Sequence, residues 1–175
     1  MVLMTKLINN IFSNSLKSTI TPILVVVIVL LPFFSFAQWA PSTKSVKKAE
    51  LTLSKVLIHY DSMEVLDLNE NYFEVLNVDG VTEGYLCYEQ APSKHDHFDF
   101  MAIFDKEMKL VKLQVLQYRE NYGGEISNKR WLNQLVVREP DKVQAISGAT
   151  ISVNSIKNAV DILSERMQKW YSAQL

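Results

Sequence analysis

The sequence predicts an α+β fold, in which an antiparallel sheet packs with helices at both ends of the chain. Three observations lead to this expectation. Residues 43–57, which follow the helix-start signal Pro41-Ser42-Thr43, and the segment from about Asn154 onward carry apolar side chains at helical spacing. The segment between them holds short aromatic and β-branched runs separated by polar turns. A set of strands flanked by helices is typical of an α+β domain.

The central part of the chain is expected to supply the sheet. Asp79-Gly80 is a hairpin-type turn signal, and residues 105–109 form a second polar turn. The predicted strands are residues 72–78, 81–88, 98–104 and 110–118. The last of these does not alternate cleanly between polar and apolar residues, which suits a largely buried strand. A polar loop over residues 119–130 and a short helix or turn over residues 131–136 follow.

Residues 1–37 have the three-part layout of a secretory signal peptide. This stretch has two lysines and no acidic residue. Its apolar run over residues 23–36 leads to Ser35-Phe36-Ala37, which has small residues at the two positions that a signal peptidase reads. We therefore expect cleavage before Gln38, an extracytoplasmic and periplasmic location, and a mature domain over residues 38–175. A membrane anchor that stays uncleaved is the main alternative and a buried core helix the other, although the run is shorter than the roughly 20 apolar residues of a membrane span.

Charge and cysteine content exclude several functional classes. The formal net charge is −1, and without residues 1–37 it becomes −3, so the basic surface that binds nucleic acid is not expected. Cys87 is the single cysteine, which excludes an internal disulfide and a c-type haem attachment. It lies in a strand-like run, where a buried small hydrophobe is its expected role. No GxGxxG motif follows a strand, so a dinucleotide fold is not expected either.

The segment Ser147-Gly148-Ala149-Thr150, with Ser152 just beyond it, gathers hydroxyl groups around a glycine between a predicted strand and the terminal helix. Glycine allows the backbone to come close to a bulky group. The first N–H groups of a helix lack partners inside the helix and carry partial positive charge, so they stabilise an anion such as phosphate. Taken by itself, the segment also suits an ordinary helix cap.

These four residues resemble the flavinylation sequence of the FMN-binding domain family. That family includes the C subunit of the sodium-pumping NADH:quinone reductase and the G subunit of the Rnf complex. The segment Tyr118–Ile126, with the sequence YRENYGGEI, resembles the family's second signature and precedes Trp131 as expected. The resemblance covers roughly residues 80–165. In the redox-pump subunits this region resembles a Thr-Pro-Gly run instead, so the chain is closer to stand-alone exported members.

The resemblance implies that a flavin transferase uses FAD to link FMN, through its phosphate, to Thr150. Arg119 is expected to face the pyrimidine end of the flavin, where a cation stabilises the reduced ring. An Arg119–Glu120 surface pair is the structural alternative. Gly123 and Gly124 would allow close approach of the backbone to the ring, and an ordinary turn is their alternative. The further cofactor-binding residues implied are Ser147, Gly148, Ala149, Ser152, Tyr118, Glu120 and Glu125.

The expected function is electron transfer outside the cytoplasm, with redox donor and acceptor proteins, some of them membrane-bound, as partners. We expect an electron carrier or a subunit of a reductase rather than a stand-alone enzyme. A second hypothesis is an exported binding module without redox chemistry that takes zinc or copper through His95 and His97. A polar loop before a strand explains these histidines more simply, because His59 is the only other histidine. A third hypothesis is an anchored interaction domain without a cofactor.

Overall fold

The computed structural model describes most of the chain that follows the predicted signal peptide. The described ranges are residues 39–57, 60–66, 71–76, 79–137 and 143–174. The signal peptide expected over residues 1–37 lies outside them. Within these ranges, no helix is both long enough and apolar enough to cross a membrane.

A five-stranded antiparallel sheet forms the centre of the domain, and each strand pairs with the next strand in the chain. The strands are β1 (Ser62–Val65), β2 (Tyr72–Leu76), β3 (Thr82–Pro92), β4 (His97–Asp105) and β5 (Leu110–Gln117). The helices are α3 (Thr43–Val56), α4 (Lys129–Val136) and α5 (Thr150–Ser172), with a short 3-10 helix, η2 (Gly124–Ser127), before α4. The predicted α+β fold, with an antiparallel sheet and helices at both ends, is therefore confirmed.

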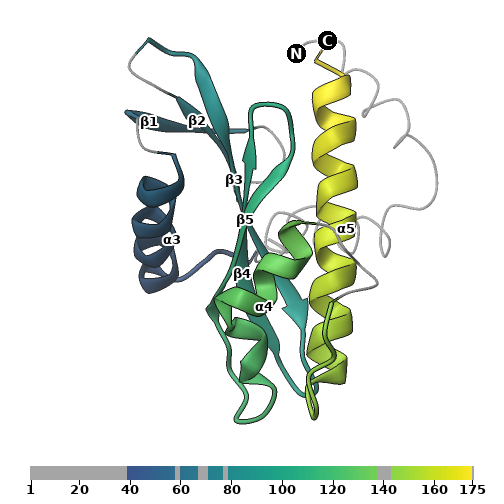
Figure 1. The fold of residues 1–175 in the computed structure, drawn as a ribbon. Helices are drawn as coiled ribbons and strands as arrows, with labels where there is room; N and C mark the ends of the chain where they lie inside the picture. Colours follow the sequence, from purple (N-terminus) through teal and green to yellow (C-terminus); the bar gives the residue numbers. More distant parts are fainter. Residues whose placement is uncertain (1–38, 58–59, 67–70, 77–78, 138–142, 175) are drawn as a thin grey trace, which may run out of the picture. The chain divides into compact units, whose positions relative to one another are not determined.

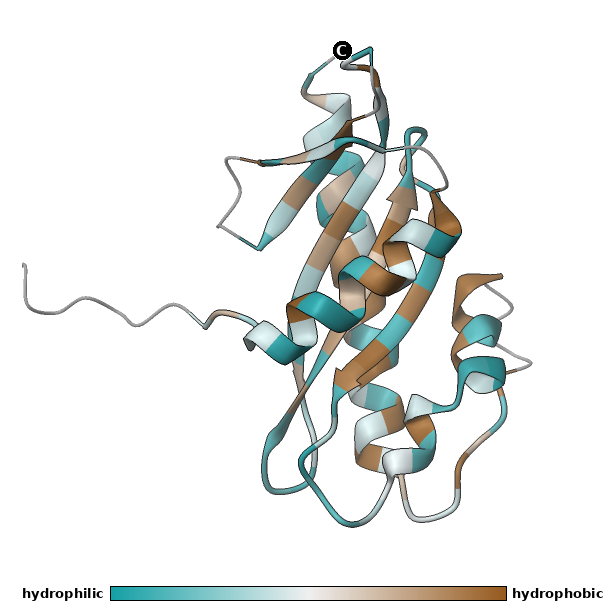
Figure 2. Ribbon diagram, turned by 90° about the vertical axis from the view of Figure 1, so that its left-hand side faces the viewer, coloured by the Kyte–Doolittle hydropathy of each residue, from teal (hydrophilic) through white to brown (hydrophobic). Residues whose placement is uncertain are grey.

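Helices cover both faces of the sheet. Figure 1 shows α3 on one face and α4 and α5 on the other. Residues Phe98–Phe104 of β4 are buried without a break, because neighbouring strand residues point to opposite faces and both faces are covered. Figure 2 shows hydrophobic residues along these strands. The expectation that the strand over residues 110–118 is largely buried is confirmed in β5.

The strands differ from the sequence-based expectation in three respects. The four-residue strand β1 was not predicted, because three of its residues are exposed and it lacks a buried alternating pattern. Strand β3 runs on to Pro92 and β4 starts at His97, so the polar segment expected to be a loop is partly strand. The strand expected just before Ser147 is not present, because residues 143–146 have no regular secondary structure.

Helix α5 begins at Thr150, four residues before the predicted start at Asn154. Its buried face begins with Ser152 and Val153, and the polar Ser152 hides this first turn from an analysis of apolar spacing. The face packs against the sheet, and Met167 places its sulfur 3.8 Å from the sulfur of Cys87. Cys87 is fully buried, and this burial raises the pKa of its thiol well above the ordinary value. The expected role of Cys87 as a buried small hydrophobe is confirmed.

Candidate functional site

The two sequence motifs meet in one pocket of about 590 Å³ at the start of α5. Its walls come from three segments that are far apart in the chain: the β3–β4 turn, the loop after β5, and the turn before α5. The lining residues are Lys94, His95, Arg119, Glu120, Asn121, Tyr122, Gly123, Glu125, Ser147 and Gly148. The fold therefore joins motifs that lie about 30 residues apart in the sequence into one site.

The turn before α5 presents Thr150 at the positive end of a 23-residue helix. Gly148 has a φ of 80°, which favours glycine, and the N–H of Ala149 donates to the carbonyl of Ile146 at 3.1 Å. Thr150 is the first helical residue and is exposed. The N-cap, Ala149, has no side chain that could accept a hydrogen bond from the first turn. The exposed hydroxyl group thus lies beside helical N–H groups that no side chain caps.

Tyr118 holds the two motifs together. Its hydroxyl group is 2.9 Å from Oγ of Ser152, on the buried face of α5. The same hydroxyl donates to the carbonyl oxygen of Tyr122 at 2.8 Å. Gly123, with a φ of 82°, packs so closely here that a Cβ atom would lie 2.7 Å from this hydroxyl and 3.3 Å from Cβ of Ala149. Glycine is therefore required at position 123 by both its backbone conformation and its neighbours.

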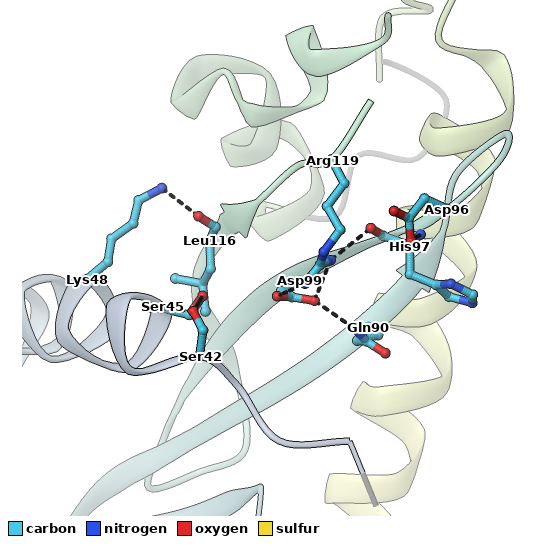
Figure 3. Close-up of polar contacts among 9 residues, drawn as sticks. All are labelled: Ser42, Ser45, Lys48, Gln90, Asp96, His97, Asp99, Leu116 and Arg119. Carbon is cyan, nitrogen blue, oxygen red and sulfur yellow. Dashed lines mark hydrogen bonds and ion pairs between the residues drawn. The ribbon is translucent and has the colours of Figure 1, made fainter. Parts of the chain in front are cut away.

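Arg119 lines the pocket, but its guanidinium group is engaged with the sheet (Figure 3). Nη1 and Nη2 donate to the two carboxylate oxygens of Asp99 at 2.9 and 2.6 Å, and Nη1 also donates to the carbonyl of His97 at 2.9 Å. Asp99 is 1% exposed and accepts a third hydrogen bond from Nε2 of Gln90. The alternative of an Arg119–Glu120 surface pair is therefore wrong. The expected role of Arg119 toward the flavin ring stays a prediction.

Glu120 also lines the pocket, and its carboxylate is bound to the β3–β4 turn. Its carboxylate accepts hydrogen bonds from the N–H groups of His95 and Asp96, at 2.7 and 3.1 Å, and from the hydroxyl group of Ser93. The bond from the His95 N–H, followed by the bond from Ser93, holds the pKa of Glu120 below its ordinary value. Arg119 thus fixes the loop that follows β5 to β4, and Glu120 fixes the same loop to the β3–β4 turn.

Three further residues named above have clear positions. Gly124 starts η2, and a Cβ atom added to it would lie 3.7 Å from the Tyr118 ring, an ordinary van der Waals distance. Glu125, in η2, lines the pocket. Trp131 is 6% exposed in the core, and its Nε1 donates to the carbonyl of Gln144 at 2.7 Å. This bond anchors the irregular segment that leads into the turn before α5.

The sequence alone does not indicate that Asp99 is the partner of Arg119 or that Lys94 lines the pocket. Asp99 was visible only as one carboxylate in a polar run, because pairing across strands depends on the sheet register. The hypothesis of a metal site at His95 and His97 gains no support. Both side chains are exposed, and in the described part of the chain no group of three or more His, Cys, Asp and Glu residues is placed to hold a metal ion.

A comparison with known protein families matches residues 94–164 to the FMN-binding domain. This region of the chain belongs to the FMN-binding domain family. The match includes both motifs and all of the lining residues of the pocket. A search of the curated proteins found no match.

The family assigns FMN as the cofactor, and the site of the FMN-binding domain suits this ligand. An uncapped helix start stabilises a phosphate group. The adjacent pocket is open to the surface, and its polar side chains and Tyr122 offer hydrogen-bonding groups and one aromatic ring to such a ligand. Ser147 and Gly148 line the pocket and lead directly to Thr150, which is exposed at the start of α5.

Proposed function

We propose that the protein is an exported flavoprotein that holds FMN through a phosphoester on Thr150 and transfers electrons outside the cytoplasm. One observation carries this proposal above the others. Thr150 is the exposed first residue of α5, beside uncapped helical N–H groups and next to the pocket that the two motifs build. FMN supplies the redox chemistry when bound, and the chain supplies position and electrostatics.

The choice of Thr150 among the nearby hydroxyl groups has a physical reason. Ser152 is 3% exposed, and its hydroxyl group is bound to Tyr118, so a transferase has no access to it. Ser147 is exposed, but it lies in the turn, three residues before the helix start. A phosphodiester on Thr150 would keep one negative charge at the positive end of α5, where an anion gains about 0.3–1 kcal/mol.

Covalent attachment also suits the proposed location. A protein outside the cytoplasm is in a dilute compartment, where free FMN would be lost by dissociation. The signal-like layout of residues 1–37 supports export, and a flavin transferase would act on the exported domain. The electron donor and acceptor would be proteins, some of them in the membrane.

Co-expression with a flavin transferase tests the proposal. The wild-type protein should give a fluorescent band on a denaturing gel under ultraviolet light, and peptide mass mapping should place FMN on Thr150. Thr150→Val should abolish the band, because only a hydroxyl group can form the phosphoester. Since Thr150 is exposed and makes no capping hydrogen bond, this change should alter the free energy of unfolding by no more than about 0.5 kcal/mol.

Thr43→Val is the matched control, because Thr43 is also the exposed first residue of a helix, α3. This variant should keep the band at full intensity. FMN mapped to Ser147, Ser152 or Ser155 would show that Thr150 is the wrong acceptor. If the wild-type protein carries no flavin after co-expression with an active transferase, covalent attachment would be refuted. The mass of the intact protein also reports whether residues 1–37 have been removed.

A further inference from the structure

Tyr122 differs in its surroundings from every other tyrosine of the chain. It is 84% exposed, whereas the other six tyrosines are buried or half-buried. It is also the only phenylalanine, tyrosine or tryptophan among the described residues that line the pocket. Tyrosine is enriched at binding surfaces, because it combines a large apolar ring with a polar hydroxyl group.

The backbone of Tyr122 is fixed although its ring is exposed. Its carbonyl oxygen accepts the hydrogen bond from the hydroxyl group of Tyr118 at 2.8 Å. The next residue, Gly123, is packed against Tyr118 and Ala149, and its carbonyl accepts the N–H of Ile126 at 3.3 Å. Only the two side-chain torsions of Tyr122 remain to be ordered when a ligand binds, which keeps the entropic cost of an aromatic contact low.

The other lining residues with side chains that could face a ring are largely engaged elsewhere. Arg119 is bound to Asp99 on β4, and Glu120 is bound to the β3–β4 turn. Among the other lining residues, Lys94 and Glu125 have no ring, and the imidazole ring of His95 is smaller than the phenol ring of Tyr122. The isoalloxazine ring of FMN is flat and apolar over much of its area, and aromatic rings of this kind pair by offset stacking.

We propose that Tyr122 stacks on the isoalloxazine ring of FMN and forms the aromatic wall of the pocket. This inference rests on the proposed function, because it requires the flavin to be held beside Thr150. It adds the contact that orients the ring, which the family match does not assign. Tyr122 is here a positioning residue for the ring, while Thr150 holds the phosphate end.

Flavin fluorescence reports such a contact directly. An excited isoalloxazine ring takes an electron from a phenol or indole ring in van der Waals contact and returns it without emitting light. The experiment measures the emission of the flavin-loaded, folded protein relative to the same sample after unfolding in denaturant, which corrects for the flavin content of each variant. The variants are Tyr122→Leu, Tyr122→Trp and the control Tyr171→Leu. Tyr171 is half-buried near the other end of α5, about 30 Å from Thr150 at a rise of 1.5 Å per residue.

Tyr122→Leu should raise the folded-to-unfolded emission ratio several-fold, and Tyr122→Trp should lower it below the wild-type ratio, because indole is the stronger electron donor. Tyr171→Leu should leave the ratio unchanged. An equal ratio in the wild type, Tyr122→Leu and Tyr122→Trp, with a fluorescent gel band in all of them, would overturn the stacking contact and leave covalent attachment intact. If Tyr122→Leu holds too little flavin to measure, the comparison of Tyr122→Trp with the wild type decides. A wild-type protein without any flavin band would overturn both proposals.

Discussion

Gly123 and Gly148 offer a matched pair of substitutions that measures how tightly Tyr118 joins the two motifs. Both glycines have a positive φ, 82° and 80°, so alanine at either position is strained by about 1–2 kcal/mol. Alanine also restricts the unfolded chain, which offsets about 0.4–1 kcal/mol of this strain. A Cβ atom on Gly148 would meet nothing within 4 Å. Gly148→Ala should therefore lower the free energy of unfolding by about 1 kcal/mol.

Gly123→Ala carries the same backbone strain and an additional clash. Its Cβ atom would lie 2.7 Å from the hydroxyl group of Tyr118, which is held by Ser152 and by the carbonyl of Tyr122. The Tyr118 ring can move aside only by losing these two hydrogen bonds, each of which contributes about 1 kcal/mol. The loss of stability should therefore reach about 3 kcal/mol.

Urea unfolding of the purified domain, monitored by far-ultraviolet circular dichroism, measures the loss in free energy of unfolding for each variant. The Tyr118→Phe background gives the decisive control, because it removes the hydroxyl group that the new Cβ atom would meet. In this background, Gly123→Ala should cost only about 1 kcal/mol, the same as Gly148→Ala. Equal losses for the two glycine variants in the wild-type background would refute the reasoning, since they would mean that Tyr118 moves aside without cost.

Two more predictions concern Arg119 and Glu120, which belong to the same loop after β5. Arg119→Ala should lower the free energy of unfolding by about 3 kcal/mol, because it leaves the buried carboxylate of Asp99 without its cation. Urea unfolding checks this value, with Arg119→Lys measured for comparison. The pKa of Glu120 is lowered in the folded state, so its carboxylate contributes stability that is present above its ordinary pKa of 4.5 and is lost as the pH falls through the lower folded value. Wild type should thus be more stable than Glu120→Gln at pH 7, and thermal unfolding should show this difference shrinking in acid. A difference that does not change with pH would contradict a role for the charged carboxylate.

The fold was predictable where one physical signal dominates. The apolar spacing of the terminal helix and the turn at Asp79-Gly80 lead directly to α5 and to the hairpin of β2 and β3. The start of α5 was placed too late because its first buried turn contains Ser152. Strand β1 is short and mostly exposed, so its pairing with β2 depends on the sheet and not on its own four residues.

The candidate site was predictable in its residues but not in their partners. The sequence indicates that Arg119 and Glu120 belong to a functional segment, yet their partners come from β4 and from the β3–β4 turn. These contacts depend on the register of β3 with β4 and of β4 with β5, which a single sequence does not specify. For the same reason, Lys94 could not be recognised as a lining residue of the pocket.

The contacts of this loop separate the residues that build the site from those free to meet a ligand. Arg119, Glu120 and Tyr118 each use their polar groups within the protein, so substituting them alters the shape of the pocket and the stability of the domain together. Thr150 and Tyr122 are exposed, and the described part of the structure records no hydrogen bond from either side chain. Substituting them should therefore change how FMN is held and leave the free energy of unfolding nearly unchanged. A loss of flavin without a loss of stability is therefore the signature of direct contact, whereas a loss of both indicates a residue that shapes the site.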